Sequence, residues 1–240
     1  MALLLNIETS TEVCSVALAN DGVVVGLRES LTGQHHAELL TVYINEVLDE
    51  CGIIGSQIDA VAVSGGPGSY TGLRIGVSTA KGICYASGLP LIALSSLEAM
   101  AGFVIQHLSD YYPSETENVL FCPMIDARRM EVYTAFYDKN GVQFREIKAD
   151  IIDHHSYLSY LENNTVLFFG NGAFKCRDSI RHRNAIFVDG ITTSSQSMVP
   201  LSERDFQLNK FVDVAYYEPF YLKDFVATIP VKNIFKGGNE

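Results

Sequence analysis

The chain has 240 residues, which fits one large domain or two lobes of about 110 to 120 residues each. Apolar residues make up 48% of the chain, enough for a buried core, and 17 basic residues against 28 acidic ones give a net charge of −11. That charge argues against a protein that grips a nucleic-acid backbone directly. The five cysteines form no C-x-x-C pair, which indicates reduced thiols and a reducing compartment.

The first predicted element is a β-meander over residues 5–28, LNIETSTEVCSVALANDGVVVGLR. Its first strand ends at Glu8, a tight turn follows, and Asp21-Gly22 marks the next hairpin turn. The start of the chain, MALLLNIETS, has no basic region and meets Asn6 early, which predicts no signal peptide. No apolar run approaches the roughly 18 residues of a membrane span, so we expect a cytoplasmic protein without membrane contact.

A helix near residues 35–50 is predicted next, followed by a strand, a glycine-rich loop and a helix in residues 58–76, IDAVAVSGGPGSYTGLRIG. The loop has two interpretations that the sequence leaves open. Its backbone N–H groups hold an anion at the start of the helix, or its glycines only make a tight, well-packed turn. No Lys-Ser/Thr pair follows the last glycine, so the loop is not a P-loop.

The remaining elements complete two similar halves. A strand is predicted over residues 91–94, a helix opens at Ser95-Ser96 with Glu98 as a capping box, and the polar segment 109–118 is interpreted as a linker. Beyond the linker, the sequence predicts a second meander over 124–145, a helix near 153–162, strands over 165–169 and 185–188 with a glycine turn at 170–172 between them, and a helix over 197–210.

The second meander, MIDARRMEVYTAFYDKNGVQFR, repeats the first. Asp126 matches Glu8, and the hairpin turn Asn140-Gly141 matches Asp21-Gly22. Strands in a meander followed by alternating strands and helices predict an α/β fold of two duplicated lobes, residues 1–108 and 119–240, each a mixed sheet flanked by helices. This is the order of the actin-like, sugar-kinase and Hsp70-like (ribonuclease H-like) architecture, and we expect the final segment to return to the N-terminal lobe.

Four segments resemble the TsaB (YeaZ) family, in this order: LNIETSTEVCSVAL, SGGPGSYTGLRIG, IDARRMEVY and YEPFYLKDFVA. The resemblance implies a non-catalytic dimerisation subunit of the bacterial machinery that makes threonylcarbamoyladenosine in tRNA. It implies a TsaD-like catalytic paralogue and a TsaE-like ATPase as partners, a homodimer when the paralogue is absent, and only indirect contact with tRNA. ATP and a metal are then expected at the partners, with no cofactor in this chain. Glu8 departs from the family, in which many relatives carry Asp.

An active site is not evident. The six histidines form no H-x-x-x-H motif, no G-x-S-x-G motif is present, and we expect no metal site and no catalytic residue. An acidic pair, Glu8 and Asp126, is the exception: it either faces a cleft between the lobes, as in actin-fold ATP-dependent small-molecule kinases, or is vestigial. The candidate vestigial nucleotide cleft consists of Glu8, Thr9, Ser10, Gly65, Gly66, Gly68 and Asp126.

Two helices of the first lobe carry more apolar or small surface than one sheet requires. On the first, the apolar residues spread over roughly half of the circumference. On the second, small residues repeat every four positions and make a ridge that another helix can approach closely. We therefore predict a partner interface, whose candidate residues are Leu39, Tyr43, Val47, Gly72, Arg74, Gly76, Ala80 and Cys84. A basic cluster, residues 177–183 (RDSIRHR), is compatible with RNA contact or, more simply, with a solvated helix face.

Overall fold

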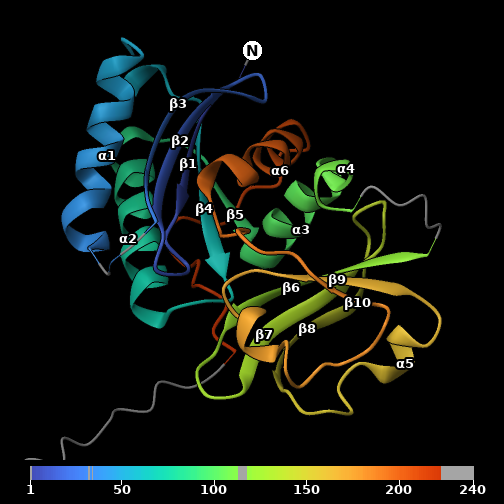
Figure 1. Cartoon of the computed structure of the whole chain (residues 1–240). Coiled ribbons are helices and arrows are strands. Elements are labelled where there is room, and N and C mark those ends of the chain that lie inside the picture. The colour runs from blue at the N-terminus through green and yellow to red at the C-terminus, as the bar shows by residue number, and fades with distance from the viewer. Residues whose placement is uncertain (1, 32, 34, 113–117, 223–240) are drawn as a thin grey trace, which may run out of the picture.

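The computed structural model describes residues 2–31, 33, 35–112 and 118–222 (Figure 1). Two five-stranded sheets follow one another along the chain, with strand orders β3-β2-β1-β4-β5 and β10-β9-β6-β7-β8. The strands of the first sheet are β1 Leu3–Glu8, β2 Cys14–Asn20, β3 Val23–Ser30, β4 Ala60–Gly66 and β5 Leu91–Ser95. Those of the second are β6 Val119–Asp126, β7 Glu131–Tyr137, β8 Gln143–Ile151, β9 Thr165–Phe169 and β10 Ala185–Phe187.

The two sheets have the same topology. In each, the first strand pairs antiparallel with the second strand and parallel with the fourth, and the fifth strand extends the parallel part. Reading the second order backwards therefore gives the first. The duplication inferred from the two meanders and the predicted two-lobed α/β fold are confirmed.

The helices are distributed unequally over the sheets. The long ones are α1 His36–Glu50, α2 Tyr70–Ser87, α3 Ser96–Gln106 and α6 Ser195–Gln207; the short ones are η1 Gly55–Gln57, α4 Leu108–Tyr111, α5 Leu158–Leu161 and η2 Phe174–Cys176. Helices α1 and α2 cover the outer face of the first sheet, where Leu5 and Ile7 of β1 join their core (Figure 1). None of the described helices is long and apolar enough to cross a membrane.

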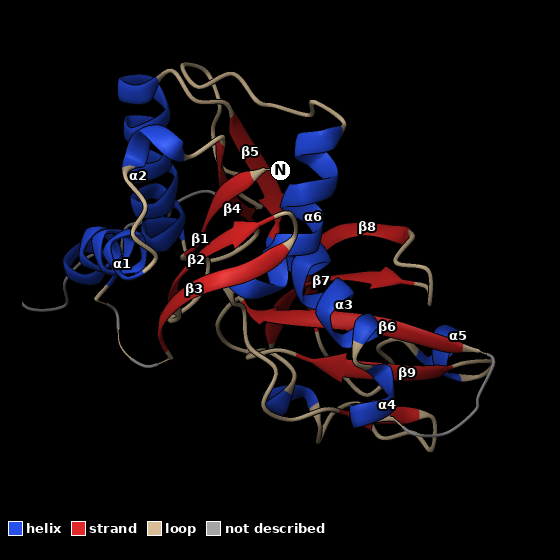
Figure 2. Ribbon diagram, turned by 90° about the horizontal axis from the view of Figure 1, so that it is seen from above, coloured by secondary structure: helices blue, strands red, loops and turns tan. Residues whose placement is uncertain are grey.

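Helices α3 and α6 lie between the two sheets (Figure 2). Leu97, Met100 and Val104 of α3, which belongs to the first half, pack into the core of the second sheet. Met198 of α6, which belongs to the second half, packs with Leu4 and other residues of the first sheet. The sheets thus divide on either side of residues 109–118, but these two helices pack across that division.

The start of α6 is fixed to the first sheet by polar contacts. The backbone N–H of Ser195 donates to Ser15 Oγ at 3.0 Å, and the two hydroxyl oxygens lie 2.6 Å apart. Ser194 Oγ donates to the Glu29 carboxylate at 2.5 Å. These buried and partly buried hydrogen bonds set the position of the second half on the first.

Two predicted helices differ in the structure. The helix expected near 153–162 is reduced to α5, because Asp153 accepts hydrogen bonds from the His155 N–H and the Ser156 hydroxyl in a turn, and Tyr157 has a left-handed φ of 64°. The helix expected over 197–210 begins two residues earlier and ends at Gln207. Residues 177–183 form turns and loop, so the solvated-helix interpretation of that segment is wrong.

The described end of the chain, residues 208–222, returns to the first lobe. Val212 forms an antiparallel bridge with Leu91, and Lys81 Nζ donates to the carbonyl oxygens of Ala215 and Tyr217. The predicted return is therefore seen for this segment, which we call the C-terminal strap; residues 223–240 lie outside the described part.

Candidate functional site

The glycine loop between β4 and α2 is filled on one side by the C-terminal strap. A Cβ atom on Gly65 would lie 2.2 Å from the Tyr217 hydroxyl, and one on Gly66 would lie 2.8 Å from the Phe220 carbonyl oxygen. Gly66 also has a φ of +107°, and the Phe220 N–H donates to the Gly65 carbonyl at 2.8 Å. Only glycine permits these approaches.

The turn after β1 fills the other side of the loop. A Cβ on Gly68 would lie 2.2 Å from the Ser10 carbonyl oxygen, and one on Gly72 would lie 2.1 Å from that of Thr9. The Ser69 N–H donates to the Ser10 carbonyl at 2.6 Å. The structure thus brings the predicted cleft residues of the first lobe together, but they contact one another, which supports the packing interpretation over an open anion cradle.

Glu8 is buried at the end of β1, below this loop. Burial raises the pKa of its carboxyl above the ordinary value, although hydrogen bonds from Ser10, Ser64 and Thr9 partly oppose that effect. The Ser10 N–H donates to Glu8 Oε1 at 2.5 Å. Because burial disfavours the ionised form of this carboxyl, and a metal ligand must be ionised, Glu8 is a poor ligand for a metal–nucleotide complex.

Asp126, the matching acid of the second lobe, has different surroundings. It is exposed, contacts Lys175 Nζ, and accepts the Arg128 N–H at 2.7 Å. Glu8 and Asp126 therefore do not form the pair facing a cleft that one sequence interpretation predicted, since one is enclosed within the first lobe and the other is held by its own lobe.

The cysteine thiols and the potential metal ligands also provide no evident catalytic site in the described part of the chain. Burial raises the pKa of the Cys14, Cys84 and Cys176 thiols to about 11, so these thiols are protonated at neutral pH. Within the described ranges, no group of three or more His, Cys, Asp or Glu side chains could hold a metal ion.

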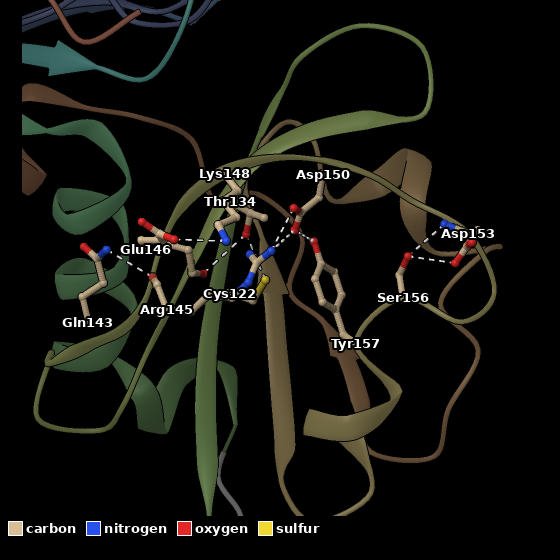
Figure 3. Close-up of polar contacts among 11 residues, drawn as sticks. Cys122, Thr134, Gln143, Arg145, Glu146, Lys148, Asp150, Asp153, Ser156 and Tyr157 are labelled. Carbon is tan, nitrogen blue, oxygen red and sulfur yellow. Dashed lines mark hydrogen bonds and ion pairs between the residues drawn. The ribbon is translucent and has the colours of Figure 1, made fainter. Parts of the chain in front are cut away.

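A polar network in the second lobe, which the sequence did not indicate, is shown in Figure 3. Arg145 Nη2 donates to both Asp150 carboxylate oxygens, at 2.8 and 2.7 Å, and the Tyr157 hydroxyl donates to Asp150 at 2.7 Å. Burial raises the pKa of the Tyr157 hydroxyl, and also that of the nearby Cys122 thiol, which lies 3.1 Å from the Thr134 hydroxyl. These groups bind one another, so the network stabilises the lobe and offers no free nucleophile.

The predicted partner interface needs correction. Its small-residue ridge faces inward: a Cβ on Gly76 would lie 2.2 Å from Thr9 Oγ1, and Val47, Gly72, Ala80 and Cys84 are also buried. Leu39 and Tyr43 are half-buried against the core of their own lobe. Among the eight candidate residues only Arg74 is exposed, with its guanidinium donating to the Tyr70 hydroxyl at 2.7 Å.

A different stripe of α2 faces outward. It consists of Arg74, Ser78, Gly82 and Tyr85. The first three lie two positions along from the buried ridge, on the opposite side of the helix, and Tyr85 lies three residues beyond Gly82. Tyr85 is 86% exposed, and no atom lies within 4 Å of a Cβ built on Gly82. On α1, the helix that packs against α2, Val42 is also exposed. We call these five residues the outer stripe. The signal available in the sequence was a tyrosine three residues after a glycine on a predicted helix.

Fold and site together define a two-lobed α/β protein of the actin-like arrangement, whose first lobe has its glycine loop closed by its own chain and an open helical face. Comparison with known proteins gives the family. A family model described as TsaD, tRNA N6-adenosine threonylcarbamoyltransferase, matches residues 22–231. The chain belongs to the TsaB (YeaZ) family, within the wider group that this model describes.

Two relatives carry that assignment, and one solved structure shares the fold. The tRNA threonylcarbamoyladenosine biosynthesis protein TsaB of Escherichia coli K12 is 33% identical over 233 residues, which cover 93% of this chain and 96% of the relative. TsaB of Haemophilus influenzae is 30% identical and covers 92% and 93%. A Pseudomonas aeruginosa protein with similarity to the peptidase YeaZ shares the fold, with a TM-score of 0.78, 24% identity, and coverage of 93% and 100%.

Proposed function

We propose that this chain is a non-catalytic subunit in tRNA threonylcarbamoyladenosine biosynthesis that docks on a TsaD-like transferase. The relatives named TsaB support the pathway. The observation that favours a docking role over catalysis is the contrast within the first lobe: the loop that would hold phosphate is filled by Ser10, Tyr217 and Phe220, whereas the outer stripe is uncovered.

The outer stripe is the proposed contact surface. It combines an exposed tyrosine and an arginine, two residue types that dominate binding energy at protein interfaces, with a glycine that allows close approach of another helix. The same stripe makes an isologous homodimer when the paralogue is absent. In this proposal ATP and the metal belong to the transferase and to a TsaE-like ATPase.

Co-purification with the TsaD-like protein of the same organism tests the surface. Gly82→Arg should reduce binding at least tenfold, because it places a long charged side chain at the centre of the stripe, while the open surroundings of Gly82 leave the fold intact. Gln196→Arg, an exposed position on α6, is the matched control. Wild-type affinity for Gly82→Arg would refute the assignment of the stripe.

The alternative of an actin-fold ATP-dependent kinase makes an opposite prediction. Calorimetry with Mg-ATP should give no micromolar binding to the isolated chain, because the strap and the β1–β2 turn occupy the loop. Micromolar binding would favour the kinase.

A further inference from the structure

A hollow of about 250 Å³ lies in the second lobe, and nothing in the proposed docking role uses it. It is bounded by the turn after β9 and the segment after β10, where these parallel strands end. Ligands of open α/β sheets bind outside the carboxyl ends of the parallel strands. Its lining includes Asn171, Phe174, Phe187, Asp189, Gly190 and Thr192.

An aromatic platform forms one wall of the hollow. Phe174 is 74% exposed, yet it is held in place, because the Arg177 guanidinium lies 5.6 Å from its ring centre and 5.5 Å from that of Phe187. Arg177 is itself fixed by Asp189 at 2.7 Å. An exposed, ordered ring with a cation on one face leaves the other face free to stack on a planar ring, as aromatic side chains do with unpaired bases.

Two arginines lie at the same edge of the sheet. Arg128 and Arg129 form the turn between β6 and β7, and β6 runs parallel to β9, so this turn and the hollow share the carboxyl edge. The Asp126 carboxylate contacts Lys175, the residue after Phe174, and also accepts a hydrogen bond from the Arg128 N–H. The turn therefore lies close to the Phe174 platform. In the described part of the chain, neither arginine side chain has a carboxylate partner.

The backbone of this turn is unfavourable for arginine. Arg128 and Arg129 have left-handed φ values of 69° and 48°, a conformation that side chains other than those of Asn and Asp adopt rarely. Strain retained at two successive charged residues is typical of a functional site.

We propose that this edge, the Arg128-Arg129 turn with the Phe174 platform, contacts an unpaired segment of the tRNA substrate. A base stacks on Phe174, and the arginines contact the flanking phosphates. This inference rests on the proposed function and adds to it that this chain itself contacts the tRNA. Because the whole chain carries −11, the contact is weak alone and adds to the affinity of the complex with the transferase.

The test measures tRNA affinity of the complex by filter binding over a range of salt. Arg128→Asn with Arg129→Gly should lower the affinity about tenfold and reduce the salt slope by about 1 to 2 units, since two phosphate contacts are lost. Asn and Gly both tolerate the left-handed φ values of these two positions, so the thermal midpoint should not fall. Phe174→Ala should lower the affinity about tenfold through lost stacking. The charge-matched control, Lys139→Ser with Lys210→Ser, should change the affinity less than twofold.

Three outcomes are distinguishable. Unchanged tRNA affinity in both variants, with the transferase still bound, overturns this inference and leaves the proposed function standing. Failure of the wild-type chain to bind the transferase overturns the proposed function itself. Saturation of the hollow by AMP, without any effect of the variants on tRNA affinity, identifies a free-nucleotide site and also overturns the RNA contact.

Discussion

The two lobes share one strand order, yet they differ at the edge where their parallel strands end. In the first lobe, a long helix follows the loop after β4, and the strap and the β1–β2 turn fill that loop. In the second, the short turn η2 follows β9, and a hollow with an exposed phenylalanine remains. Duplicated topology therefore does not preserve a duplicated site. Whether this edge of a sheet is filled or open depends on the loops and helices that pack against it.

The lobes also bury charge in different ways. The first lobe encloses Glu8 among hydroxyl and N–H groups, and burial raises the pKa of its carboxyl, whereas the second lobe encloses Arg145 against Asp150 as an ion pair. Burial of a lone ionised group is costly, and protonation or pairing are the two ways to avoid that cost.

The close packing of α2 against the turn after β1 is most directly disrupted at Gly72. Gly72→Ala should lower the free energy of unfolding by about 3 kcal/mol, because the new Cβ meets the Thr9 carbonyl at 2.1 Å. Gly82→Ala, on the same helix with open surroundings, should instead raise it by about 0.5 to 1 kcal/mol. Urea denaturation measures both, and equal effects would contradict the inward orientation of the small-residue ridge.

The ion pair of the second lobe can be broken from one side. Arg145→Met should cost about 2 to 3 kcal/mol, because it leaves the largely buried Asp150 carboxylate without its cation. Adding Asp150→Leu should recover part of this loss, since no charge then remains buried. A double-mutant cycle by urea denaturation measures the coupling, and additive losses would show that the pair contributes nothing.

The raised pKa of Glu8 predicts that stability depends on pH. Because burial raises the pKa of Glu8 above 4.5, its contribution to stability is fully present below that pH and declines as the pH rises through the folded pKa. Glu8→Gln should therefore raise the unfolding free energy at pH 8 by about 1.4 kcal/mol for each unit by which the pKa is raised. Parallel stability–pH curves for the two proteins between pH 4 and 9 would contradict this account.

Asp126→Asn should have the smallest effect and sharpens the contrast with Glu8. Its carboxylate is exposed and contacts Lys175 at the surface, so its loss should change the unfolding free energy by less than about 0.5 kcal/mol. Thermal unfolding at two salt concentrations measures this; a shift as large as that of Glu8→Gln would mean that the two acids are equivalent after all.

Local patterns in the sequence were sufficient for the sheets and the turns. Alternating strands, the Asp21-Gly22 and Asn140-Gly141 hairpins, and Ser95 at the start of α3 all form as predicted. The four-residue repeat on α2 correctly marked a stripe of small side chains. It did not reveal that the stripe faces Thr9 and the sheet, because periodicity identifies a face of a helix but not what covers it.

Contacts between distant parts of the chain account for the rest. No local sequence pattern predicts that Tyr217 contacts Gly65, or that α6 packs on the first sheet, because both contacts depend on packing between distant parts of the chain. The hollow beside Phe174 likewise results from the short η2 turn, where the first lobe has a long helix.

The crossing of α3 and α6 between the sheets has a consequence for how the molecule unfolds. If the chain were cleaved within residues 113–117 and the two fragments separated, the second sheet would lose its contacts with Leu97, Met100 and Val104. The first sheet would lose its contact with Met198, so apolar surface would be exposed on both sheets. Neither fragment should be stable alone, and the intact chain should melt in one cooperative transition despite its two-lobed shape.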